Sequence, residues 1–195
     1  MKTFLRLFSG DAFKGTKNYL KTQRTFEILR MLLFFALSGA LFLTGYLTTG
    51  TKMNLLTIVA VLGVLPASKA AVSVIMFCRY KTLSEDAASK IEAHTNGLTC
   101  LYDLVFTANE KNFPVGHLTI KGNTVCGYSE QKDFDEPAFD KHIDKLLKTD
   151  NHKNVNIKIF TDLSKYVARL DQMQALSCDE ASTQGIADTL KSVSL

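Results

Sequence analysis

The sequence predicts a membrane protein in two parts, a two-helix transmembrane hairpin and a cytosolic α+β domain. Two long apolar runs lie close together near the N-terminus, from Met31 to Leu47 and from Met53 to Cys78. The first run has no charged side chain, and the second has only Lys69. Each is near the roughly 20 residues that a helix needs to cross the hydrocarbon core of a bilayer. About 115 residues follow the hairpin, enough for one soluble domain with its own core.

These observations divide the chain into three segments. Residues 1–27 are predicted to be a basic amphipathic cytosolic leader, and residues 28–79 the transmembrane hairpin. The two spans are expected at about 29–48 and 54–78, and the cytosolic α+β domain at 80–195.

The distribution of basic residues predicts the orientation of the hairpin. Seven basic residues precede the first run, against two acidic ones, and Arg79 and Lys81 follow the second run. The connecting loop carries only Lys52. Because Lys and Arg beside a span mark its cytosolic side, we expect a multi-pass protein of the cytoplasmic (inner) membrane with both termini in the cytosol. The basic leader is too long for a cleavable signal peptide, so none is expected.

The leader is a candidate for contact with the membrane surface. Its basic and apolar residues alternate, which favours binding to anionic lipid headgroups at about 1 kcal/mol for each Lys or Arg. Alternatively, these charges only fix the topology. Nucleic-acid binding is not expected, because the chain from Leu83 onward is acidic, with 12 basic and 17 acidic residues. The candidate membrane-surface residues are Lys2, Arg6, Lys14, Lys17, Lys21, Arg24 and Arg30.

Small residues and one lysine are the notable features of the second span. Gly63, Ala67 and Ala71 recur every four residues, so they line one helix face on which helices approach closely. That face packs either within the hairpin or against another membrane protein. Lys69 is a functional candidate if it lies deep in the bilayer. If the span ends near Ser68, its ammonium group extends into the headgroup region.

After the hairpin, the sequence predicts one helix and three strands. Thr82 and Glu85 match a capping box, which predicts a helix over residues 83–95. Gly122-Asn123 is a two-residue hairpin signal between two strands rich in β-branched residues. The strands are expected at residues 98–108, 115–121 and 124–129.

A second group of helices and one strand completes the predicted domain. Asp135 is expected to cap a helix at which Phe134 packs on Phe139 as a hydrophobic staple. Alternating apolar residues over 155–160 predict a half-buried strand, and Asp162 is expected to cap the next helix. The predicted order is α-β-β-β-α-β-α, with a possible extra C-terminal helix, which is an α+β domain.

This predicted order is similar to the core of restriction-endonuclease-like domains, over residues 83–161. That family holds a metal ion with an Asp near the second strand and a Glu-x-Lys on the third. The corresponding strands here read Val-Gly-His-Leu-Thr-Ile-Lys and Thr-Val-Cys-Gly-Tyr-Ser, without a carboxylate. The resemblance therefore implies a catalytically silent relative, and a fold alone does not give a function.

Motifs that would indicate an enzyme are absent from the sequence. There is no Gly-rich phosphate loop, no Gly-x-Ser-x-Gly and no His or Cys spacing typical of a metal site, so no cofactor or metal is expected. His117 and Cys126 fall on adjacent strands, but only as diagonal neighbours, because residue 117 is expected to pair with residue 128. An enzyme with an unrecognised site near His117, Asp103 or Asp162 remains an alternative.

The main functional hypothesis is a membrane-anchored, non-enzymatic adaptor, scaffold or accessory subunit whose cytosolic domain binds a protein partner. An acidic stretch over 15 residues is either a solvated face or a docking patch for a basic partner. A subunit of an oligomeric channel or transporter is a further alternative. The candidate partner-binding residues are Lys69, Glu130, Asp133, Asp135, Glu136, Asp140 and Asp144.

Overall fold

The structure, a computed structural model, describes residues 13–108, 111–152, 154–176 and 180–195. The chain forms two compact units. In its described part the first unit is Leu20–Lys81, and the second unites residues 13–19 with Thr82–Leu195. Two predicted membrane-surface residues, Lys2 and Arg6, lie outside the described residues.

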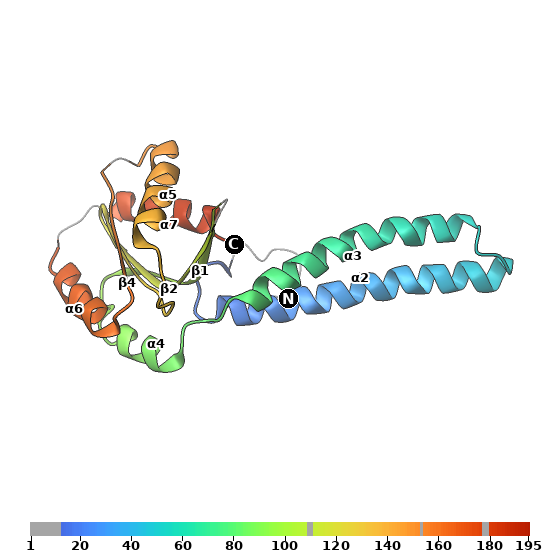
Figure 1. Ribbon diagram of the computed structural model, residues 1–195, viewed down its shortest axis with the longest axis horizontal. Coiled ribbons are helices and arrows are strands. Elements are labelled where there is room, and N and C mark those ends of the chain that lie inside the picture. The colour runs from blue at the N-terminus through green and yellow to red at the C-terminus, as the bar shows by residue number, and fades with distance from the viewer. Residues whose placement is uncertain (1–12, 109–110, 153, 177–179) are drawn as a thin grey trace. The chain divides into compact units, whose positions relative to one another are not determined.

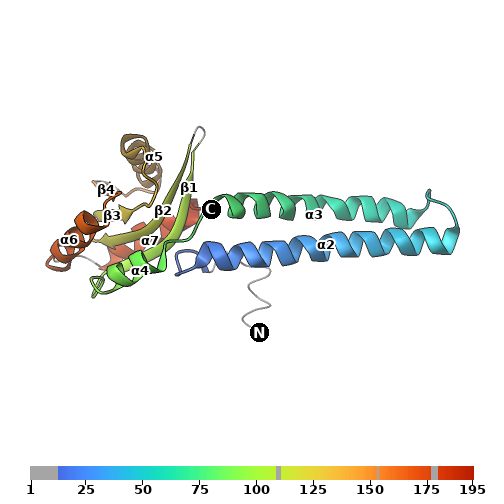
Figure 2. The ribbon, with the colours of Figure 1, turned by 60° about the horizontal axis from the view of Figure 1, so that its bottom comes forward.

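The first unit is a hairpin of two long helices, α2 (Tyr19–Thr49) and α3 (Leu55–Arg79), which run side by side (Figures 1 and 2). Both are long and apolar enough to cross a membrane. Only 11% and 17% of their most apolar stretches are buried, unlike the core helix of a soluble protein. Helix α2 has 31 residues, so the basic segment from Lys21 to Arg30 continues into the apolar run without a break.

Small residues pack the two helices of the hairpin against each other. The buried residues Ala60, Ala67 and Ala70 of α3 recur at spacings of three and seven, and Gly63 falls on the same face. A Cβ atom at Gly63 would lie 2.7 Å from the Oγ atom of Ser38 in α2. The predicted small-residue face therefore serves packing within the hairpin, because any larger side chain would force the helices apart.

The turn of the hairpin is held by Asn54, which caps α3. Its side-chain oxygen accepts a hydrogen bond of 2.9 Å from the backbone N–H of Thr57. A Cβ atom at Gly45 of α2 would lie 2.6 Å from the same oxygen atom and 2.8 Å from Cβ of Leu56. Glycine is therefore needed where α2 passes the start of α3.

The second unit is built on a mixed four-stranded sheet with the strand order β1-β2-β3-β4. Strands β1, β2 and β3 pair antiparallel, and β4 pairs parallel with β3. The tight turn at Gly122-Asn123 pairs Lys121 with Thr124, which confirms the predicted hairpin. The strands are β1 (Thr99–Thr107), β2 (Asn112–Lys121), β3 (Thr124–Tyr128) and β4 (Asn156–Phe160).

Helices cover both faces of this sheet, α5 and α7 on one face and α4 and α6 on the other (Figure 1). On the first face, the fully buried Phe139 lies 5.5 Å from the rings of both Phe106 and Phe113, measured between ring centroids. On the second face, Ile91, Tyr166 and other helix residues pack on the sheet. The helices are α4 (Glu85–Glu92), α5 (Glu136–Thr149), α6 (Leu163–Gln174) and α7 (Glu180–Val193).

Two of the three predicted helix caps are confirmed. Asp135 accepts a hydrogen bond from the N–H of Ala138, and Asp162 accepts from the N–H of Ser164. The predicted capping box at Thr82 is wrong. Helix α4 begins at Glu85 with Ser84 as its N-cap, and no side-chain capping bond is formed there. It ends at Glu92, earlier than predicted.

The outer edge of β1 is covered by two segments from far apart in the sequence. Gly15 accepts a backbone hydrogen bond of 2.9 Å from Tyr102, and Leu195 donates one of 2.9 Å to Val105. The Lys14 ammonium group donates to the carbonyl of Ser194 at 2.8 Å, which ties the two segments together. This covering removes an exposed strand edge on which another chain could pair.

The packing of the hairpin can be tested by a disulfide between its two helices. An ideal Cβ atom at Gly63 lies 3.7 Å from Cβ of Ser38, which matches the separation in a disulfide. In a chain whose native cysteines are replaced by alanine, the pair Ser38→Cys and Gly63→Cys should form an intramolecular disulfide in membranes after mild oxidation. Mass spectrometry and gel mobility would detect it.

The matched control is the pair Gly39→Cys and Gly63→Cys. A Cβ atom at Gly39 would have no atom of α3 within 4 Å, so this pair should stay reduced. Disulfide-linked dimers in place of the internal bond, or equal oxidation of both pairs, would contradict the packing of the hairpin described above.

Candidate functional site

The sheet face beneath α4 and α6 carries His117, one of the residues that the sequence suggested as catalytic. His117 is fully buried, and its Nδ1 atom lies 2.7 Å from the hydroxyl oxygen of Tyr166. That hydroxyl group also lies 3.0 Å from the Oγ1 atom of Thr119. The expected pairing of His117 with Tyr128 is confirmed, so Cys126 is its diagonal neighbour.

The groups of this cluster stay neutral near physiological pH. Burial lowers the pKa of His117 to about 3 and raises the pKa of the Tyr166 hydroxyl well above its usual range. Burial also raises the pKa of the Cys126 thiol, although a hydrogen bond from Arg169 and the charges of Arg169 and Lys158 oppose this effect. A neutral imidazole that no solvent reaches is part of a structural polar network, because a general base must reach its substrate.

The two acidic residues considered in the enzyme hypothesis, Asp103 and Asp162, accept hydrogen bonds from backbone N–H groups. Asp103 is buried, and its carboxylate accepts a hydrogen bond of 2.9 Å from the N–H of Leu83, before α4. Its φ angle of +55° places it in the left-handed region, which Asp tolerates better than most residues. Asp162 caps α6. The structure therefore gives Asp103, Asp162 and His117 separate structural roles.

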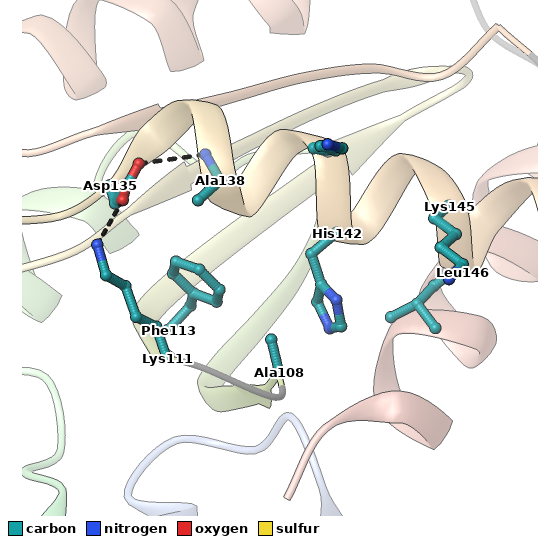
Figure 3. Close-up of a pocket in the computed structure, with 9 residues that line it drawn as sticks. Ala108, Lys111, Phe113, Asp135, Ala138, His142, Lys145 and Leu146 are labelled. Carbon is teal, nitrogen blue, oxygen red and sulfur yellow. Dashed lines mark hydrogen bonds and ion pairs between the residues drawn. The ribbon is translucent and has the colours of Figure 1, made fainter.

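A pocket of about 520 Å³ lies beside α5, where the end of β1 and the start of β2 meet it (Figure 3). Phe113 of β2, and Ala108 just after β1, face His142 and Leu146 from the helix. Pockets of about 300–1,000 Å³ with mostly apolar walls and a few polar groups are typical of ligand sites. This pocket is the candidate functional site.

Three lysines surround the apolar floor of the pocket. Lys141 and Lys145 are four residues apart on α5, so they share one face of the helix, and Lys111 approaches from the start of β2. The Nζ atom of Lys111 lies 2.6 Å from a carboxylate oxygen of Asp135 (Figure 3). Hydrogen bonds from Lys111 and from the N–H of Ala138 hold the pKa of Asp135 below its usual value.

Lys141 and Lys145 are the cations that the pocket offers to a ligand. Neither makes an ion pair with another residue in the described part of the chain. They place two positive charges beside the apolar surface of Phe113 and Leu146. Sequence reasoning missed these residues. The spacing of Lys141 and Lys145 indicates that both lie on one face of a helix, and this can be read from the sequence. That the end of β1 and the start of β2 lie opposite them cannot be read from the sequence.

Three of the six acids in the predicted docking patch have partners within the domain. Glu130 accepts a hydrogen bond from the Ser84 hydroxyl, Asp135 pairs with Lys111, and Asp144 pairs with Lys148 at 2.6 Å. Burial, followed by the charge of Glu136, raises the pKa of Asp140 to about 6. Among the described residues, Asp133 and Glu136 make no ion pair. The six acids thus do not form one uniform free surface.

Lys69 lies on the exposed side of α3. Ser38 of α2 lies opposite Gly63 of α3, and Gly45 lies opposite Leu56. Residues of the two helices whose numbers add to 101 therefore lie opposite each other along the hairpin. Lys69 is therefore level with residue 32 of α2, two residues or about 3 Å along the axis from Arg30. Lys69 is thus level with the point on α2 where the charged segment ends and the apolar run begins.

Three of the predicted membrane-surface residues have partners within their own unit. Lys14 donates to a backbone carbonyl, as described above, and Lys17 pairs with Glu92 at 2.7 Å. Arg30 pairs with Glu27 at 2.7 Å on α2. Lys21 and Arg24 also lie on α2, where Lys21 is exposed and Arg24 half-buried.

Comparison with protein-family models, with curated proteins and with solved structures finds no match for this chain. The described residues contain no group of three or more His, Cys, Asp or Glu side chains placed to hold a metal ion.

The buried state of His117 predicts how stability depends on pH. The pKa is about 3 in the folded chain and about 6.5 in the unfolded chain, so the unfolded state binds more protons between these values. The stabilisation is complete above about pH 6.5 and falls toward pH 3, by up to about 1.4 kcal/mol per pH unit. Urea unfolding followed by tyrosine fluorescence at a series of pH values would measure this loss.

The variant His117→Gln isolates this effect from the titration of the carboxylates. Its free energy of unfolding should fall less steeply between pH 6.5 and pH 4 than that of the wild type. Equal slopes in the two proteins would show that the imidazole is not kept neutral by burial.

Proposed function

We propose that this chain is a membrane-anchored, non-enzymatic protein whose soluble domain binds an acidic segment of a partner protein. Helices α2 and α3 supply the anchor, and the pocket beside α5 supplies the binding site. The observation that carries the binding role is the position of Lys141 and Lys145, which make no ion pair among the described residues, beside an apolar floor. This basic site occurs in a region of the sequence whose net charge is negative.

The anchor is proposed to lie in the cytoplasmic membrane with both termini in the cytosol. The support is the excess of Lys and Arg beside the open end of the hairpin, and the single Lys52 in its turn. With this orientation, Lys69 and Arg30 lie at one level near the cytosolic boundary. Lys69 would there extend its ammonium group to the headgroups, and Lys21 and Arg24 would lie close to anionic lipid.

The chemistry of the pocket defines the partner segment. Charge complementarity favours carboxylates that approach Lys141 and Lys145. The ring of Phe113 and the side chain of Leu146 favour an apolar side chain next to those carboxylates. A volume of about 520 Å³ holds one or two side chains, so the segment would insert an apolar residue flanked by Asp or Glu. Asp133 and Glu136, nearby, are available to a basic residue of the same partner.

Peptide binding to the full-length protein in phosphatidylcholine nanodiscs tests this function. The probe is a fluorescein-labelled hexapeptide with one Phe flanked by Glu on both sides, measured by fluorescence anisotropy. We expect a dissociation constant of tens to hundreds of micromolar that rises with salt, because exposed charges are screened. The double variant Lys141→Glu and Lys145→Glu should weaken binding at least tenfold.

The matched control is Lys90→Glu with Lys165→Glu, which makes the same change in net charge on helices α4 and α6. Its affinity for the peptide should equal that of the wild type. A peptide with Lys in place of Glu should not bind. Equal weakening by the two double variants, or no binding at millimolar peptide, would refute the proposed site.

A further inference from the structure

A second pocket, of about 320 Å³, lies between the edge strand β4 and helix α6. It is on the opposite face of the sheet from the α5 pocket, because Cys126 and Phe160, which line it, belong to the core beneath α4 and α6. Its lining comes from β3, β4 and α6. The two pockets share no residue.

The register of the parallel strands brings the floor of this pocket together. Cys126 of β3 is opposite Lys158 of β4, and Thr124 is opposite Asn156. Side chains two residues apart on one strand point to the same face of the sheet, and so do paired residues on adjacent strands. The four side chains therefore lie together on one face. All four line the pocket.

Helix α6 supplies the opposite wall. Arg169 and Gln172 are three residues apart and therefore adjacent on the helix surface. A guanidinium N–H of Arg169 donates a hydrogen bond of 2.9 Å to the side-chain oxygen of Gln172. This bond holds the guanidinium group and leaves the amide N–H groups of Gln172 available as donors.

The pocket is lined by two cations and no acid. In the described part of the chain, neither Lys158 nor Arg169 makes an ion pair. The ammonium group of Lys158 lies 5.6 Å from the centroid of the Phe160 ring, a cation–π contact that holds it near the pocket. Lys158 also acts on Asp140 of α5, whose pKa it lowers, so Asp140 is the acid that competes for its charge.

Cys126 forms the buried floor and adds no negative charge. Its exposed fraction is 1%, and burial raises the pKa of its thiol. The thiol therefore stays protonated near neutral pH and is a weak donor, not a nucleophile. The remaining neutral groups, Thr124, Asn156 and Gln172, all carry N–H or O–H donors.

We propose that this pocket between β4 and α6 binds a phosphate monoester. A phosphate group carries a charge of −1.5 to −2 near pH 7 and three acceptor oxygens, which match two cations and several neutral donors. Arg169 offers a planar fork for two of these oxygens, and Lys158 a point charge. The Phe160 ring provides an apolar surface for the organic group of the ester.

The probes for this site are inorganic phosphate and phenyl phosphate, titrated calorimetrically into the full-length protein in phosphatidylcholine nanodiscs. Phenyl phosphate should bind in the micromolar to low millimolar range, and more tightly than inorganic phosphate, because its ring contacts Phe160. Arg169→Gln and Lys158→Gln should each weaken binding at least tenfold. Phosphatidic acid in the nanodisc should leave binding of phenyl phosphate unchanged if the ester is soluble, and should block it if the source is a lipid headgroup.

The matched control is Lys165→Gln, which removes an exposed cation from the same helix outside the pocket. This variant should bind phenyl phosphate like the wild type, and circular dichroism should show that all three variants are folded. No heat of binding at 10 mM phenyl phosphate would overturn the proposal. Equal affinities of the wild type, Arg169→Gln and Lys158→Gln would overturn it too.

Because Lys141→Glu with Lys145→Glu leaves this pocket intact, that variant should retain full affinity for phenyl phosphate. The experiment on the phosphate site therefore tests a proposal that is independent of the peptide site beside α5.

Discussion

The pairing of β2 with β3 across the turn at Gly122 sets the register on which the sheet of the second unit is built. Gly122 has a φ angle of +56°, a conformation that glycine adopts without a steric penalty, and it closes the turn with Asn123. A slip of one residue would move every side chain of a strand to the other face. The observed register places Leu118 and Ile120 toward α5 and α7, and the polar side chains toward α4 and α6.

Consequently, the two faces of the sheet differ in character. The face beneath α5 and α7 is an apolar core in which the rings of Phe106, Phe113 and Phe139 are in contact. The face beneath α4 and α6 holds the buried contacts of His117 and Tyr166 and, at its edge, the pocket with Lys158. Buried polar groups on this face need hydrogen-bond partners, because an unpaired buried polar atom is costly, and the Nε2 atom of His117 has no such partner among the described residues. The apolar face has no such requirement.

Local charge, rather than net charge, characterises the two pockets. The chain from Leu83 onward has five more acidic than basic residues, yet lysines line the α5 pocket, and Lys158 and Arg169 line the pocket between β4 and α6. The Debye length is about 8 Å at physiological ionic strength, so distant surface acids contribute little to the potential inside a pocket. Several acids are also neutralised locally, as Asp135 is by Lys111 and Asp144 by Lys148. An acidic composition is therefore compatible with sites for anions.

The sequence by itself determined features that depend on neighbours in the chain. The two long apolar helices, the turn at Gly122 and the caps by Asp135 and Asp162 follow from composition and local hydrogen bonding, and all of them are present in the structure. The staple between Phe134 and Phe139, with ring centroids 5.4 Å apart, is local in the same sense.

Only the tertiary structure decided which distant residues meet. Asp103 holds the N–H of Leu83, Lys111 approaches α5, and Arg169 lies over β3 and β4 because strands and helices from different parts of the chain pack together. Spacing along the sequence carries no information about such contacts, since each depends on the order of strands in the sheet and on the faces that the helices cover.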